Sequence, residues 1–191
     1  MSHTINSPRL ANHFYRRIAG TVLLSAVAAL ILPNSGSGWF AAASADDISQ
    51  LPAAPGAKFS ANVDGKPFVA TWVGTTYTTI KGQETLNVTG HIGTGIDSQF
   101  INCNIVEPKV GSYVLGGHAM GTSCSYHGGG DVFNGHFHFE SGSIEITELD
   151  AGKTVSGTFS GSGKNMSGNK TLAVTDGHFT KIPLGQQSRV P

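Results

Sequence analysis

From residue 57 onward, apolar and polar residues alternate in short segments that glycine-rich turns separate. Alternation with a period of two, together with many Val, Ile, Thr and Phe residues, predicts strands rather than helices. The alternating segments are 59–63, 67–73, 85–92, 99–106, 133–139, 143–149, 154–159 and 171–174. A sheet with one apolar face must be closed or covered. We therefore predict an all-β domain: an antiparallel meander of about nine or ten short strands, closed into a barrel or a two-sheet sandwich.

The turns between these segments predict part of the strand pairing. A two-residue hairpin turn at 141–142 would place Phe139 opposite Ile144. A connection at 150–153 would place Phe159 beside the same Ile144. Both turns put these apolar side chains on one inner face, whereas a slip of one residue would send every side chain to the other face.

The same reasoning extends the predicted sheet in both directions. The connection at 150–153 also places Ile146 opposite Gly157. A turn at 127–131 would bring Tyr126 and Phe133 together on the inner face. Together these pairings predict a four-strand meander with one apolar face.

The first 45 residues have the pattern of a secretory signal peptide. A basic start precedes an apolar run at 18–32, and Ala43-Ser44-Ala45 precedes a predicted cut before Asp46. The alternative is a membrane anchor, but the run has 15 residues, and a spanning helix needs about 20. We therefore expect an exported protein, periplasmic or extracellular, that has no membrane anchor once the signal is cleaved.

The remaining chain divides into three parts by composition. Residues 46–56 are expected to form a flexible leader, 57–184 a single β domain and 185–191 a flexible tail. After cleavage the chain keeps nine basic and twelve acidic residues, a formal charge of −3. This balance argues against nucleic acid as a partner, because nucleic acid rewards clustered Lys and Arg.

Three stretches of the chain are similar to a known family. FSANVDGKPFVA (59–70), SGSIEITELDAGKTVSGTFSGSGKN (141–165) and VTDGHFTKI (174–182) resemble an uncharacterised family of exported bacterial β-domain proteins, many of them lipoproteins. The resemblance implies an exported β domain of unknown function, and it brings no catalytic residues with it. The chain departs from the lipoprotein pattern because no cysteine follows the apolar run near its N-terminus.

Cys103 and Cys124 are the only cysteines of the chain. An exported chain with two cysteines usually joins them, and the alternation points both side chains inward. A strand at 110–116 lying between them would hold them about 9.5 Å apart, beyond the roughly 7 Å that a disulfide spans. We predict the disulfide, which requires 110–116 to leave this part of the sheet. The alternative is a pair of buried thiols that act as small apolar side chains.

The segment DVFNGHFHFE (131–140) admits two interpretations. The predicted register points His136 and His138 outward and places Glu145 across from His138. Two imidazoles and a carboxylate on one face are able to hold a divalent metal. The alternative is a solvated polar face, since nothing in the sequence supplies the groups that orient metal ligands. We favour the polar face and expect no cofactor, with a divalent metal at His136, His138 and Glu145 as the alternative.

Motifs for catalysis are weak in this chain. There is no G-x-S-x-G nucleophile motif, and Glu145 and Glu148 fall on opposite strand faces, so they cannot share a substrate. We predict a non-enzymatic exported domain that binds an unknown small molecule or protein. The alternative function is an exported metal-binding protein that uses surface histidines.

Overall fold

The structure, a computed structural model, describes residues 49–80, 82–116, 121–150 and 152–191. The chain separates into two compact units, Met1–Trp39 and Phe40–Pro191, and every described residue belongs to the second. The predicted signal peptide at 1–45 therefore lies outside the described residues. No helix in the described part is long and apolar enough to cross a membrane.

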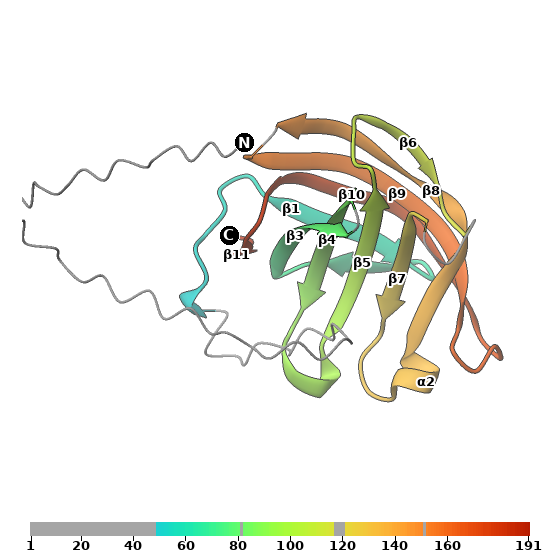
Figure 1. The fold of residues 1–191 in the computed structure, drawn as a ribbon. Coiled ribbons are helices and arrows are strands. Elements are labelled where there is room, and N and C mark those ends of the chain that lie inside the picture. The colour runs from blue at the N-terminus through green and yellow to red at the C-terminus, as the bar shows by residue number, and fades with distance from the viewer. Residues whose placement is uncertain (1–48, 81, 117–120, 151) are drawn as a thin grey trace, which may run out of the picture. The chain divides into compact units, whose positions relative to one another are not determined.

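The described domain is an antiparallel sheet, which confirms the all-β prediction (Figure 1). Two one-turn helices, η1 (Gly95–Asp97) and α2 (Val132–Gly135), lie between strands. The strands are β1 (Lys58–Val63), β2 (Lys66–Val69), β3 (Trp72–Ile80), β4 (Gln83–Ile92), β5 (Gln99–Val106), β6 (Gly111–Val114), β7 (Ser123–His127), β8 (His136–Asp150), β9 (Thr154–Asn165), β10 (Thr171–Pro183) and β11 (Gln187–Arg189).

The strands form one strongly curled sheet in the order β11-β3-β4-β5-β7-β8-β9-β10-β1-β2, with β6 paired to β8. Neighbours along most of this path follow one another in the sequence, as a meander requires. The connections from β2 to β3 and from β10 to β11 are exceptions, because each links strands far apart in this order. Thr75 of β3 strengthens the connection from β10 to β11: its Oγ1 donates to the carbonyl of Pro183 at 2.8 Å and accepts from the Gly185 N–H at 2.7 Å.

Phenylalanine rings fill the inner face of the curled sheet. Phe59, Phe68 and Phe179 are fully buried, and the rings of Phe59 and Phe159 lie 5.4 Å apart. Glycine backbone makes room for them: a Cβ on Gly90 would overlap the ring of Phe59. The rings and the glycine backbone are therefore in close contact on the inner face of the described domain.

The predicted hairpin at 141–142 is wrong. Strand β8 runs without interruption from His136 to Asp150, and Gly142 pairs with Gly161 of β9. The register shifts between Phe139 and Ser141, which is a β-bulge. A bulge adds one residue to a strand and so moves the inward positions from odd to even numbers without a turn. A hairpin is not needed to explain why both Phe139 and Ile144 are buried.

The pairing of β8 with β9 agrees with the prediction at Ile144 and Ile146, but beside the connection Leu149 lies opposite Val155 instead of the predicted Thr154. Ile144 lies opposite Phe159 and Ile146 lies opposite Gly157, as expected. Beyond Ile146 the register shifts by one residue. This second irregularity is invisible in the alternation, because the positions near the turn are partly exposed.

The predicted pair of Tyr126 and Phe133 is also wrong. Tyr126 pairs with Phe137, because residues 132–135 form the helix α2 instead of strand. The carboxylate of Asp131 accepts a hydrogen bond from the Phe133 N–H at 3.0 Å and starts this turn, a common role for Asp at a helix N-terminus. The side chain of Phe133 is 65% exposed, whereas that of Phe137 is 8% exposed.

Both ends of the predicted domain are more ordered than the sequence suggested. Residues 187–189, expected in a flexible tail, form β11 and pair with β3. Ala53, expected in a flexible leader, forms a parallel bridge with Arg189, and the neighbouring Ala54 is buried. Ala53 thus pairs with the strand that itself pairs with β3.

The predicted disulfide is present between Cys103 and Cys124, with an S–S distance of 2.03 Å. The two residues lie directly opposite each other on β5 and β7. This pairing is possible because β6 leaves the space between those strands and pairs with residues 143–146 of β8. The structure therefore meets the predicted requirement that residues 110–116 leave this part of the sheet.

Removing the disulfide tests its contribution to stability. The double variant Cys103→Ser/Cys124→Ser should lose about 3 kcal/mol of unfolding free energy, because the bridge restricts the unfolded chain across a separation of 21 residues. Urea unfolding would measure this loss. Unfolded wild-type protein should show no free thiol before reduction, and two titratable thiols would contradict the bridge.

Phe137 and Phe133 form a matched pair that tests the corrected register. Phe137→Ala should cost about 3–5 kcal/mol, because it leaves a cavity in the core. Phe133→Ala should change stability by less than about 0.5 kcal/mol, since its side chain is mainly in solvent. Equal losses in urea unfolding would support the pairing of Tyr126 with Phe133 instead.

Candidate functional site

A row of aromatic rings crosses the outer face of five strands. Each member lies directly opposite the next in the strand register. Side chains that face each other across antiparallel strands are about 4.5–5.5 Å apart at Cβ, so large rings at these positions touch. The row consists of Trp72 on β3, His91 on β4, Phe100 on β5, His127 on β7 and His136 on β8.

The tightest contact in this row joins Trp72 and His91. Their ring centres lie 3.7 Å apart and their planes differ by 6°. Trp72 is 4% exposed, and its Nε1 donates to the carbonyl of Gly93 at 3.3 Å. Phe100 continues the row at 5.2 Å from His91. This end of the row is a rigid, satisfied aromatic stack.

Three histidines gather at the other end of the row. The rings of His127 and His136 lie 5.9 Å apart, and His138 is 4.7 Å from His136. His127 and His136 are each 8% exposed. Within the described residues, the buried Nδ1 of His127 has no hydrogen-bond partner.

Burial keeps the imidazoles of the row neutral. Desolvation lowers the pKa of His91 to about 3 and also lowers the pKa of His127. The pKa of His136 falls to about 4, first through desolvation and then through the neighbouring His138 and His127. Buried bases of this kind favour their uncharged form. The row therefore carries no charge on these side chains near neutral pH.

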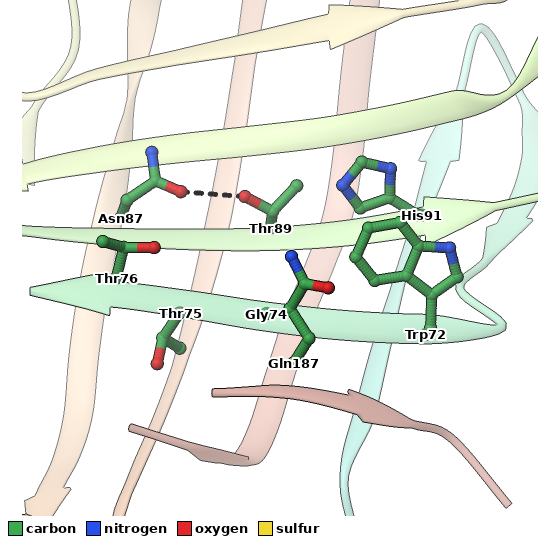
Figure 2. Close-up of a pocket in the computed structure, with 8 residues that line it drawn as sticks. All are labelled: Trp72, Gly74, Thr75, Thr76, Asn87, Thr89, His91 and Gln187. Carbon is green, nitrogen blue, oxygen red and sulfur yellow. Dashed lines mark hydrogen bonds between the residues drawn. The ribbon is translucent and has the colours of Figure 1, made fainter. Parts of the chain in front are cut away.

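A small, shallow hollow, open to solvent on one side, lies beside the Trp72 end of the row (Figure 2). Strands β3 and β4 form its base, and β11 contributes one side chain from its margin. The lining residues are Trp72, Gly74, Thr75, Thr76, Asn87, Thr89, His91 and Gln187. None of them is an acid, an amine or a thiol.

The side chain of Gln187 reaches the hollow because Gly74 leaves room for it. The two residues are opposite each other on β11 and β3, and a Cβ on Gly74 would lie 3.3 Å from Cγ of Gln187. Figure 2 shows the Gln187 side chain crossing β3 at this point, with its amide directed toward β4. Gln187 is exposed, so its amide meets solvent in the free protein.

Side-chain hydrogen bonds fix the polar wall of the hollow. The amides of Asn87 and Asn102 bond to each other in both directions, at 2.9 and 3.1 Å. The hydroxyl of Thr89 donates to Oδ1 of Asn87 at 2.8 Å, and Nδ2 of Asn102 donates to that hydroxyl at 3.1 Å. These bonds hold the amides in set orientations before any ligand arrives.

No charged side chain occupies the outward positions of β3, β4, β5 and β7 in the described part of the chain. By contrast, the outward positions of β8, β9 and β10 include exposed Glu145, Lys164 and Asp176. We call the first surface the uncharged face. Besides the row residues of those strands, it comprises Gly74, Thr76, Thr78, Gln83, Thr85, Asn87, Thr89, Asn102, Asn104, Val106, Ser123 and Ser125.

Residues 56–183 match the family model described as Domain of unknown function (DUF6252). The chain belongs to this family. No curated protein and no solved structure matches the chain. The match agrees with the resemblance to an uncharacterised family at 59–70, 141–165 and 174–182. Export of this DUF6252 domain stays a prediction.

The predicted metal-binding set of His136, His138 and Glu145 is not brought together. Because β8 is continuous, Glu145 lies seven residues beyond His138 on the same strand, roughly 23 Å away. The residue of β9 opposite His138 is Lys164, whose ammonium would repel a metal ion. In the part of the chain that the structure describes, no group of three or more His, Cys, Asp or Glu residues could hold a metal.

The prediction of an outward, solvated His136 is also incorrect in part. His136 does point away from the Phe137 side, but its neighbours His127 and Phe100 bury it. His138 is exposed, as expected. A one-strand pattern shows which face a residue takes, whereas the burial of that face depends on the strand that lies beside it.

The residues that line the hollow of the DUF6252 domain were missed from the sequence. The alternation predicts one strand over 67–73, but β2 ends at Val69 and β3 begins at Trp72. The threonine-rich stretch that continues β3 to Ile80 has little alternation. If a hairpin between 72–80 and 83–92 had been predicted from the sequence, it would have placed Trp72 opposite His91. That pairing was the one sequence signal that could have located the hollow.

Acid should destabilise the domain through its buried histidines. The pKa of His91 and His136 is lower in the folded protein than the usual value of about 6.5, so the unfolded chain binds more protons in acid. Stability should therefore be complete above about pH 6.5 and fall as the pH drops toward 4. Urea unfolding at pH 7, 6, 5 and 4 would measure the decline.

A variant pair separates this effect from the general effect of acid on carboxylates. His91→Gln should show a smaller loss between pH 7 and pH 4 than the wild type. His178→Gln, at an exposed position of β10, should follow the wild type. Identical slopes for all three proteins would contradict the role of the buried His91.

Proposed function

We propose that this domain is a non-enzymatic binding module that acts after export, in the periplasm or outside the cell. We propose further that it binds its ligand or partner on the uncharged face. The observation that carries the proposal is the contrast between a filled interior and an outer face that combines aromatic rings, amides and hydroxyls without charge. Such a face offers binding groups, whereas large rings occupy the inner face.

The packing of the interior supports a surface site over an internal one. Small-molecule carriers with a barrel fold hold the ligand among the inward side chains. Here those positions are occupied by rings that touch each other and the glycine backbone, as Phe59, Phe159 and Gly90 illustrate. A ligand inside would have to displace core side chains at a cost of several kcal/mol.

The composition of the uncharged face also supports binding. The buried centres of protein interfaces contain few charges and many aromatic residues, and antibody binding surfaces are rich in Ser and Asn. The face has this composition, and the bonds between Asn87, Asn102 and Thr89 hold its polar groups in place. Ordering these groups beforehand lowers the entropic cost of binding.

The lining of the hollow supports a non-enzymatic role. General acid–base catalysis needs a group whose pKa lies near the working pH. The one titratable lining residue is His91, which stacks on Trp72 and has a pKa of about 3. It has little tendency to take up a proton at neutral pH.

Two features support export. Residues 1–45 have the basic, apolar and small-residue pattern of a signal peptide. The disulfide between Cys103 and Cys124 is of the kind that persists in oxidising compartments. The protein recovered from the native compartment should therefore begin at Asp46.

Fragment mapping by NMR tests the proposed binding surface without knowledge of the ligand. A library of neutral, cationic and anionic small molecules is added to isotope-labelled domain, and shifted amide signals are assigned. Hits should gather on β3, β4, β5 and β7, because groups there are ordered and free of competing charge. Hits that gather on β8–β10, or that scatter evenly, would contradict the proposal.

Two lysine substitutions provide the matched control. Asn104→Lys places a charge on the uncharged face at a position on β5 that is partly exposed. Thr180→Lys places the same charge at an exposed position of β10. The first should remove the fragment hits and the second should leave them unchanged.

A further inference from the structure

Three strands of the described sheet, β2, β6 and β11, have a strand partner on one side only. The pairing of β2 with β1 directs Pro67 to the outer edge of β2, and proline has no N–H to offer there. The outer edge of β11 is covered, because Arg189 donates to the carbonyl of Pro52 and accepts from the Ala54 N–H. Of these three edges, only that of β6 is neither covered nor interrupted by proline (Figure 1).

The register of β6 with β8 shows which backbone groups face the open side of β6. The Leu115 N–H donates to the carbonyl of Gly142 at 3.0 Å, so position 115 belongs to a hydrogen-bonded pair. Hydrogen-bonded and non-hydrogen-bonded pairs alternate along an antiparallel ladder, and the register of β6 with β8 is unbroken. The N–H and C=O groups of Ser112 and Val114 therefore point away from β8. These four groups are placed to bond a further strand.

The side chains at this edge do not oppose the approach of another strand. Residues 110–116 include no charged residue, and Ser112 is exposed. Val110 is 60% exposed and Val114 is 80% exposed. Proteins commonly protect a strand edge with charged side chains, proline or a covering segment. The edge of β6 has none of these among the described residues, and its two exposed valines gain from burial.

Tyr113 orders the edge before any partner arrives. Its side chain packs against the core. Its hydroxyl accepts from the Lys109 N–H at 2.7 Å and donates to the carbonyl of Lys109 at 2.8 Å. These bonds hold the chain that leads into β6. Pairing with another strand therefore costs less conformational entropy than ordering a free segment would.

We propose that β6 pairs with β6 of a second copy of this chain, as antiparallel strands related by a two-fold axis. A two-fold register centred on Tyr113 places Ser112 of each copy opposite Val114 of the other. All four open backbone groups of each copy then form hydrogen bonds within the bounds of β6 (Gly111–Val114). This inference goes beyond the proposed function, because no residue of the uncharged face lies on β6.

A second copy suits this edge better than an unrelated peptide because the edge is complementary to itself. A two-fold axis brings identical strands together, so a charged residue near the axis would lie close to its own copy, and like charges that face each other are destabilising. Serine opposite valine avoids this repulsion. Each copy has one such edge, so the pair closes as a dimer. Since β6 has four residues, the interface is small and the association should be weak.

Sedimentation equilibrium of the mature, disulfide-bonded protein tests the proposal. Between about 10 µM and about 1 mM, a range that includes weak association, it should show a reversible equilibrium between monomer and dimer. A monomer throughout this range would overturn the proposal, as would assembly beyond the dimer. A mixed library of extended peptides serves as the alternative occupant. If the protein stays monomeric while peptides shift the amide signals of Ser112 and Val114, the edge has a different partner and the proposal is wrong.

Charge substitutions at the edge test its register. Ser112→Lys/Val114→Lys places like charges opposite each other and should weaken the dimer at least tenfold. Ser112→Lys/Val114→Glu places Lys opposite Glu on both sides of the axis and should keep the wild-type affinity or raise it. The control, Ala173→Lys/Thr175→Lys, puts two lysines at exposed positions of β10, which has strands on both sides. It should leave the dimer unchanged. A dimer that survives the first change, or that is lost in the second or in the control, contradicts this register.

Amide hydrogen exchange locates the contact without any substitution, and decides the matter if the lysine variants prove unfolded by thermal denaturation. The amides of Ser112 and Val114 should exchange more slowly as the protein concentration rises, because they become hydrogen-bonded in the dimer. The amide of Tyr113, which the register already directs toward β8, should show no such dependence. A dimer that forms without slowing the first two amides uses another surface, and the proposal would then be wrong.

Discussion

Close contact between phenylalanine rings and glycine backbone is the constraint on which this domain depends. Gly90 leaves space for Phe59, Gly157 for Phe179, and Gly177 for Phe159. Large rings from one part of the curled sheet thus rest directly on the backbone of another. A side chain at any of these glycines would overlap the neighbouring ring, so the strands would have to move apart. These contacts between rings and glycine backbone account both for the tight curl of the sheet and for the rings that occupy its inner face.

Because large rings occupy the inner face, we propose that binding takes place on the outside of the sheet. Side chains there are ordered by strand register instead of by burial in a core. The clearest case is the row that begins with Trp72 and His91 and ends at His136, in which five strands each supply one ring at the same level. Stacking and desolvation along this row remove charge from its histidines, so a histidine-rich surface becomes a neutral one.

The sequence predicted the parts of the fold that depend on the local alternation of apolar and polar residues. The inward positions of Ile144, Ile146 and Phe159 are confirmed, although the predicted pairing beside the connection at 150–153 is one residue out: Leu149 lies opposite Val155, and the register shift after Ile146 compensates. The prediction of the disulfide also set a geometric condition on residues 110–116, and β6 meets it by pairing elsewhere. In contrast, the metal-binding set failed because one assumed hairpin placed Glu145 beside His138.

Alternation along the chain determined that this is an all-β domain and which side of a strand most residues take, because side chains alternate with a fixed period of two. Only the tertiary structure decided the register, because a bulge adds a residue without changing the pattern on either side. At residues 141–142, where a hairpin was predicted, β8 instead continues through a bulge between Phe139 and Ser141 as one long strand. The alternation of apolar and polar residues could not predict the hollow either, because the hollow depends on the pairing of distant strands. It requires Gln187, Trp72 and Asn87 to meet, and β11 brings Gln187 to β3 across more than 100 residues of sequence through backbone pairing, which carries no signal in the side chains.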